Sequence, residues 1–241
     1  MSARPENLPE QTDCGRLSGG PFCLLHCRAM RTRINVLICV VGVLLVSGYG
    51  SAQQKPAAKY PELAQKLRAG DMSVNFWELR ASCFDWSDCG DYDPHDAKQK
   101  MFRALQANDF AEALKSANEI LKHKITDLDA QAVAWMADKE MGNEQEAGVH
   151  LAITKKLMDS IMQGNDGKSP QHAWMVVEVP EEYSVLRLLG LRTTKQALLQ
   201  NNGHAFDEMT VSDGKHEITL YFNIDFDMKK LGETIGGATK K

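Results

Sequence analysis

Residues 205–226 read AFDEMTVSDGKHEITLYFNIDF, two runs of alternating apolar and polar residues on either side of Asp213-Gly214. In the second run, every other residue from Ile218 to Phe226 is apolar. A period of two predicts a β-strand with one buried face and one wet face, and Asp-Gly is a frequent pair in tight hairpin turns. This stretch therefore predicts two antiparallel strands, at 205–211 and 216–226.

More of the same sheet is expected upstream. Asn202-Gly203 is a second hairpin signal, directly before the first of these strands. The further elements expected are strands at 173–179 and 195–200 and a short helix at 183–189. The sequence thus predicts an antiparallel sheet region over residues 171–231, and a flexible tail at 232–241.

The apolar period changes to 3.6 in residues 53–163, which predicts helices. The expected helices lie at 60–67, 76–83, 101–105, 110–121, 127–141 and 143–162. The expected fold is therefore α+β, with N-terminal antiparallel helical hairpins followed by a small antiparallel β-sheet with a short helix.

Two of these helices begin with the same pattern. Asp109 with Glu112, and Asn143 with Glu146, are offset by 34 residues, and both pairs are typical of capped helix starts. A 34-residue period resembles the tetratricopeptide repeat over residues 97–162, although the tryptophan, tyrosine and closing proline of that repeat are absent. We interpret it as local helical-hairpin packing, with a peptide-binding groove as the alternative.

The N-terminus has the order of a secretory signal. Arginines precede an apolar run at 36–46, and small residues at 48–52 follow it. The run has 11 residues, whereas a membrane-spanning helix needs roughly 20. We expect residues 1–52 to be a leader and cleavable signal peptide with the true start at Met30, and the mature protein to be periplasmic or secreted without a stable membrane span.

Removal of that leader changes the cysteine and charge inventory. Four of the six cysteines lie within it, and only Cys83 and Cys89 remain. A close pair in an oxidising compartment predicts a disulfide. Of 28 basic and 32 acidic residues, the leader holds five and three, so the mature chain has 23 and 29, a net charge of −6. A mildly acidic chain without a basic cluster argues against binding to nucleic acid.

Motifs for nucleotides, serine hydrolases and zinc proteases are absent from the sequence. The acidic stretch 85–96 could gather oxygens around calcium, but aspartates in a turn more often solvate it and cap the next helix. His172, His204 and His216, with Asp207 and Asp225 as partners, could serve acid–base chemistry only if the fold brings them together. We expect no cofactor and no metal.

Several segments together carry a family resemblance. They are Tyr60-Pro61-Glu62-Leu63, Ala69-Gly70-Asp71, Asp166-Gly167-Lys168-Ser169-Pro170, Glu182-Tyr183-Ser184-Val185-Leu186 and Leu220-Tyr221-Phe222-Asn223-Ile224-Asp225. With the helical hairpins, they resemble the bacterial family called domain of unknown function 4919. The resemblance implies exported proteins with no established activity and no assigned catalytic residues.

Two functional hypotheses follow. The first is a non-catalytic envelope protein that binds another protein or a peptide through the helical hairpins and the adjoining sheet edge. The second is a small periplasmic hydrolase with its site where helices meet sheet. The residues expected to form a ligand surface there are Trp174, Tyr183, His204 and Tyr221.

Overall fold

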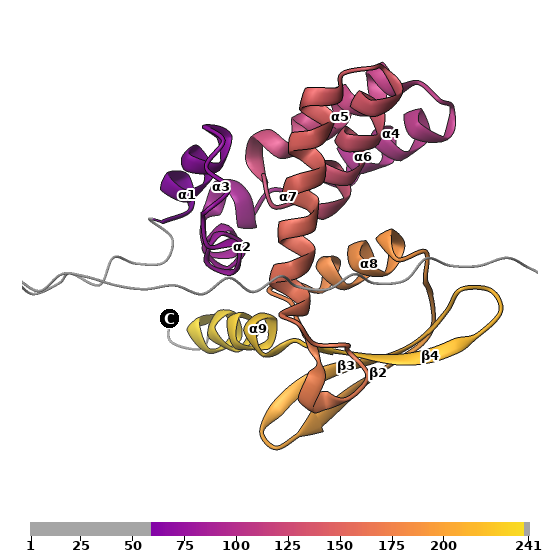
Figure 1. The fold of residues 1–241 in the computed structure, drawn as a ribbon. Coiled ribbons are helices and arrows are strands. Elements are labelled where there is room, and N and C mark those ends of the chain that lie inside the picture. Colours follow the sequence, from indigo (N-terminus) through magenta and orange to yellow (C-terminus); the bar gives the residue numbers. More distant parts are fainter. Residues whose placement is uncertain (1–58, 239–241) are drawn as a thin grey trace, which may run out of the picture. The chain divides into compact units, whose positions relative to one another are not determined.

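The computed structural model describes residues 59–238, with side chains to residue 232 (Figure 1). The predicted signal peptide and the start at Met30 lie outside these residues. The elements run in the order α1 (Lys59–Arg68), α2 (Phe76–Asp85), α3 (Ser87–Gly90), α4 (His95–Gln106), α5 (Phe110–His123), α6 (Leu128–Glu140), α7 (Glu144–Met162), a 3₁₀ turn (Pro170–His172), β1 (Trp174–Met175), α8 (Val179–Leu188), β2 (Arg192–Asn201), β3 (His204–Ser212), β4 (Glu217–Asn223) and α9 (Asp225–Ala238).

The helices α4 to α7 pack as consecutive antiparallel neighbours (Figure 1). Asp109 caps α5 as predicted, because its side chain accepts a hydrogen bond from the Glu112 amide at 3.1 Å. Asn143 precedes α7 but makes no such bond, because its amide donates instead to Asp138 Oδ1 at 3.0 Å. The 34-residue pattern is therefore sequence symmetry with only one working side-chain cap, and its relation to the tetratricopeptide repeat stays a prediction.

The sheet has the strand order β1-β4-β3-β2. β2, β3 and β4 form the predicted antiparallel meander, but β1 pairs with β4 in parallel, so the sheet is mixed. β1 is also shorter than the strand predicted at 173–179, because Pro180 lies in the first turn of α8 and that helix starts at Val179.

The C-terminal end differs from the prediction in a second way. The last strand ends at Asn223, whose side chain accepts a hydrogen bond from the Asp225 amide at 3.0 Å. α9 begins there and continues through residues 232–238, where a flexible tail is predicted. Phe226 therefore leaves the sheet and packs against the Trp77 and Phe84 rings of α2.

Two apolar cores hold the chain together. In the first, α7 residues such as Leu157 and Ile161 meet α1, α2 and the inner face of the sheet, where Leu220 and Phe222 are buried. The second lies among α4, α5 and α6 and consists largely of alanines, including Ala113 and Ala134. Small side chains let helix axes approach closely, which explains why α6 is buried on most sides.

Candidate functional site

An apolar groove lies between α1, α5 and α7, with a volume of about 590 Å³. Its lining residues are Leu67, Arg68, Ala69, Gly70, Asn118, Leu121, Lys122, Ile125, Gln131, Val149, His150 and Ile153. Val149 stands 43 % exposed within it, although aliphatic side chains on α7 are otherwise mostly covered. An open apolar groove with a few polar groups has the character of a site for an apolar peptide segment.

The floor of the groove is the connection between α5 and α6. The Ile125 amide donates to Tyr60 Oη at 3.1 Å, and the Ile125 carbonyl accepts from Gln131 Nε2 at 2.8 Å. Gln131 Oε1 in turn lies 2.7 Å from His150 Nδ1. These bonds hold the floor in one conformation and leave no buried backbone group of Ile125 unpaired.

The rim of the groove is positively charged on one side. Arg68 Nη2 donates to the Leu121 and Lys122 carbonyls at 3.3 and 3.0 Å. These bonds satisfy carbonyl groups in the last turn of α5 that have no partner within the helix. Lys122 also lines the groove. Burial lowers the pKa of His150 on the opposite wall, so that imidazole is neutral at pH 7. The groove therefore combines apolar walls with a cationic rim.

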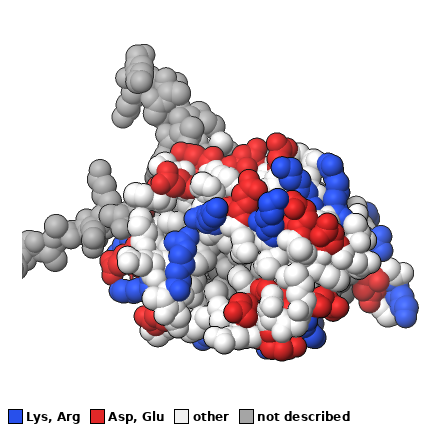
Figure 2. All heavy atoms as spheres, turned by 90° about the horizontal axis from the view of Figure 1, so that it is seen from above, with Lys and Arg blue, Asp and Glu red and all other residues white. Residues whose placement is uncertain are grey.

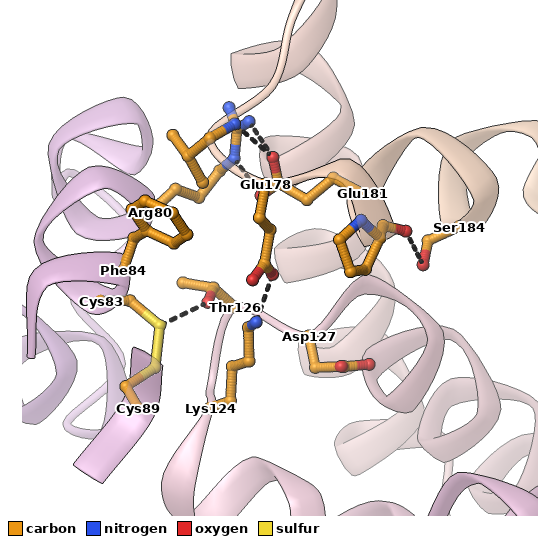
Figure 3. A network of polar contacts seen from close by, with 12 residues as sticks. Arg80, Cys83, Phe84, Cys89, Lys124, Thr126, Asp127, Glu178, Glu181 and Ser184 are labelled. Atoms are coloured by element: carbon orange, nitrogen blue, oxygen red, sulfur yellow. Dashed lines mark hydrogen bonds and ion pairs between the residues drawn. A yellow bond between two sulfur atoms is a disulfide. The ribbon is translucent and has the colours of Figure 1, made fainter. Parts of the chain in front are cut away.

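On the other side of the same connection lies a polar junction, in which α2, α6 and α8 are joined by buried charges (Figure 3). Lys124 forms an ion pair with Glu178, and Lys98 pairs with Asp127 and Asp129 at 3.0 and 2.9 Å. A cavity of about 160 Å³ lies among these side chains. A volume of that size holds a few water molecules or one small polar molecule.

Arg80 and Glu181 form the most buried pair of the junction. Arg80 is 1 % exposed, and its Nε and Nη2 donate to the two Glu181 oxygens at 2.8 and 2.6 Å (Figure 3). Its remaining donors reach Ser160 Oγ at 3.1 Å and the Met175 carbonyl at 2.9 Å. The forked bond joins α2 to α8, which are 101 residues apart in the chain.

Asp129 accepts from three donors, namely Lys98 at 2.9 Å, Ser184 at 2.8 Å and Arg187 at 2.7 Å. Burial acts to raise the pKa of Asp129, but the two cations outweigh it and hold that pKa below its usual value of 3.8. Lys98 shows the converse, because its two carboxylates outweigh burial and raise its pKa. Groups compensated in this way stay charged near neutral pH, which favours a structural role over proton transfer.

Cys83 and Cys89 are joined in a disulfide that borders the junction, with their Cα atoms 5.3 Å apart. Both cysteines are almost fully buried, and Thr126 Oγ1 donates to Cys83 Sγ at 3.3 Å. The short helix α3 overlaps the end of this loop, where the sequence predicts only a turn. The disulfide therefore contacts the same connection that forms the floor of the groove.

The four residues predicted to form a ligand surface lie on two faces of the sheet. Trp174 is buried on the inner face beside Phe222, and Tyr183 of α8 reaches Gln196 at that face's edge. Tyr221 pairs with Glu208 on the outer face, where His204 also lies by the strand alternation. The ligand surface itself stays a prediction.

The predicted histidine–carboxylate partners meet in one case. His204 Nδ1 lies 2.5 Å from Asp225 Oδ2, with 59 % and 38 % of the two side chains exposed. His172 and His216 contact Asp166 and Asp213 at the surface. Within the described part of the chain, no three His, Cys, Asp or Glu side chains are placed to hold a metal ion, the acidic stretch 85–96 included.

Charges of both signs are interspersed on the face shown in Figure 2. Among the described helices, none combines the length and apolar character that a membrane crossing requires.

The fold is thus an α+β domain in which helical hairpins and a small mixed sheet share one long helix, α7. The chain belongs to the family described as domain of unknown function (DUF4919), whose model matches residues 52–232. No curated protein and no solved structure matches the chain.

Proposed function

We propose that this chain is exported and acts as a non-catalytic binding module of the cell envelope, which takes a peptide segment of another protein into the groove between α1, α5 and α7. The observation that carries the proposal is the groove itself, whose walls are mainly apolar and leave Val149 exposed. Full burial of an exposed aliphatic side chain is worth roughly 1.5–3 kcal/mol, so covering the 43 % of Val149 that is exposed contributes about 1 kcal/mol to binding.

The rim charges define the expected ligand further. Arg68 and Lys122 favour a segment that carries an acidic residue beside its apolar side chains. The polar junction supports a binding role in a different way, because its ion pairs fix α8, α2 and the groove floor relative to one another. A fixed groove costs less ordering free energy on binding than a mobile one.

The test begins with a peptide library displayed on phage and selected on the full mature chain. Affinities of the selected peptides are then measured by fluorescence anisotropy for wild type, Val149→Asp and the control Leu189→Asp. Val149 and Leu189 are equally exposed, at 43 %, but only Val149 lines the groove. We expect Val149→Asp to weaken binding by tenfold or more, and Leu189→Asp to stay within twofold of wild type.

A second measurement identifies the natural partner and tests export. A photo-crosslinking amino acid is placed at position 149 or, as control, at 189 in cells that make the protein, and crosslinked proteins are identified by mass spectrometry. A partner captured only from position 149 supports the proposal, whereas equal capture from both positions contradicts it. The same spectra report the N-terminus, which export with signal cleavage predicts at Gln53.

The His204–Asp225 contact favours one alternative, a small hydrolase. Such an enzyme needs the pair beside a pocket that excludes water. Neither residue lines the groove or the cavity of the polar junction. Hydrolysis of a broad panel of ester and peptide substrates that is lost in His204→Ala would support the enzyme and contradict the non-catalytic role.

A further inference from the structure

Glu182 of α8 is a buried carboxyl group without a donor. It is 0 % exposed, and among the described residues no amide, hydroxyl or cationic group donates a hydrogen bond to either of its carboxyl oxygens. Its neighbour Glu181 is also buried and Glu178 is partly buried, but these two are paired with Arg80 and Lys124. An ionised carboxylate in such a position carries a desolvation cost of several kcal/mol, which protonation removes.

The polar group that faces Glu182 is another carboxyl group, that of Asp207 on β3, which lies within hydrogen-bond reach. Asp207 is 6 % exposed on the inner face of the sheet. Its Oδ2 accepts from Gln196 Nε2 at 2.8 Å, and Gln196 Oε1 accepts from the Tyr183 hydroxyl at 2.6 Å. Two carboxyl groups can form a hydrogen bond to each other only when one of them holds a proton.

The acidic groups around Glu182 all raise its pKa. Asp227 lies on α9, and Glu181 and Tyr183 lie on α8 itself. Burial and the negative charges of Asp207, Asp227 and Glu181 together raise the pKa of Glu182 to about 9. Lys230 on α9 offsets part of this effect by lowering the pKa of Asp227, which burial nevertheless raises overall.

We infer that Glu182 and Asp207 share one proton in an O–H···O hydrogen bond, and that this bond is a proton-dependent latch between helix α8 and the sheet. The proton leaves to water or buffer base as the pH rises, and two adjacent buried carboxylates then repel each other. Because Asp227 adds a third negative charge from α9, both α8 and α9 loosen from β3 in the deprotonated state.

The direction of the pH effect follows from proton linkage. Glu182 holds its proton up to about pH 9 in the folded chain but only up to about 4.5 when unfolded. The folded state therefore binds more protons between these values, and stability falls as the pH rises through that range. The unfolding equilibrium constant rises by up to tenfold per pH unit from this group alone.

The test compares wild type with Glu182→Gln in urea denaturation at pH 6, 7 and 8. Glutamine keeps the shape and donates permanently to Asp207, so it replaces the shared proton. The ratio of the wild-type unfolding constant to that of Glu182→Gln should rise by up to a hundredfold between pH 6 and 8. Glu208→Gln is the matched control, because Glu208 is adjacent on β3 but on the outer face, and its ratio should stay within threefold.

Infrared spectroscopy of wild type gives an independent readout that needs no variant. At pH 7 the carbonyl band of a protonated carboxylic acid should be present, and it should disappear above pH 9 together with amide-exchange protection in α8 and α9. A wild-type spectrum without that band at pH 7 overturns the inference. It is also overturned if the unfolding constants of wild type and Glu182→Gln keep the same ratio from pH 6 to pH 8.

Discussion

Replacing Arg80 by methionine tests the buried ion pair that joins α2 to α8. The variant keeps an unbranched side chain, although a shorter one, and removes every donor. Glu181 then retains one hydrogen bond, from the Val177 amide to Oε2 at 2.9 Å. Its side chain is only 8 % exposed, so bulk water solvates the remaining carboxylate poorly.

The expected loss follows from those contacts. Breaking a buried ion pair on one side costs about 3–5 kcal/mol, because the remaining charge is left without compensation. That is a large share of the roughly 5–15 kcal/mol by which domains are stable. Arg80→Lys keeps the charge but cannot reproduce the forked bond, and we expect it to cost about 2 kcal/mol. Replacing both partners, as Arg80→Met with Glu181→Met, should recover part of the loss.

Urea denaturation followed by circular dichroism measures these free energies of unfolding. Tryptophan fluorescence gives a second readout to which Trp77 contributes, because the Arg80 guanidinium lies 5.4 Å from the centre of its ring. The four proteins form a double-mutant cycle, in which a positive coupling between the two positions is expected. The reasoning is refuted if Arg80→Met lies within about 1 kcal/mol of wild type, or if the double variant is no more stable than Arg80→Met.

Three further predictions concern other parts of the structure. Asp129→Asn should lower the free energy of unfolding by about 2–4 kcal/mol at pH 7. The difference from wild type should shrink as the pH falls through the lowered folded pKa of Asp129, because that stabilisation is complete only above pH 3.8. A difference that does not change in an acid titration would contradict this. Replacing Cys83 and Cys89 by alanine should lower stability by about 2 kcal/mol in thermal melts, because so short a loop restrains little chain entropy, and an equal melting temperature would contradict it. Gly167→Ala should lower the free energy of unfolding by about 2–4 kcal/mol, because φ is +71° and a Cβ would come 2.9 Å from the Trp174 ring. Gly164→Ala, at φ +77° but with open space around it, should lower it by only about 1–2 kcal/mol. Equal losses in chemical denaturation would contradict the clash with the ring.

The sequence alone determines the local elements of this protein. Apolar residues at a period of 3.6 indicate the helices, and alternation about two Gly turns indicates the strand hairpins, because these signals depend on neighbouring residues only. The ends of these elements were harder to predict. The last strand stops at Asn223, because its side chain accepts a hydrogen bond from the Asp225 amide and α9 begins there. The Cys83–Cys89 pair was also predictable, since its six-residue separation is itself local.

Only the tertiary structure decided the roles of Glu178, Glu181 and Glu182. In the sequence they are three acidic residues at the start of a helix, a pattern typical of an exposed first turn. Their spacing holds one signal, because Glu181 and Glu182 lie four residues before the buried Val185 and Leu186 and therefore share their face.

That signal indicates burial but not which partner each carboxyl group meets. Lys124 is 54 residues from Glu178, and Arg80 is 101 residues from Glu181. Glu182 of α8 instead faces Asp207 on the inner face of the sheet. Contacts between distant segments depend on how helices and strands pack, so the same three residues become two ion pairs and one carboxyl pair only in the folded chain.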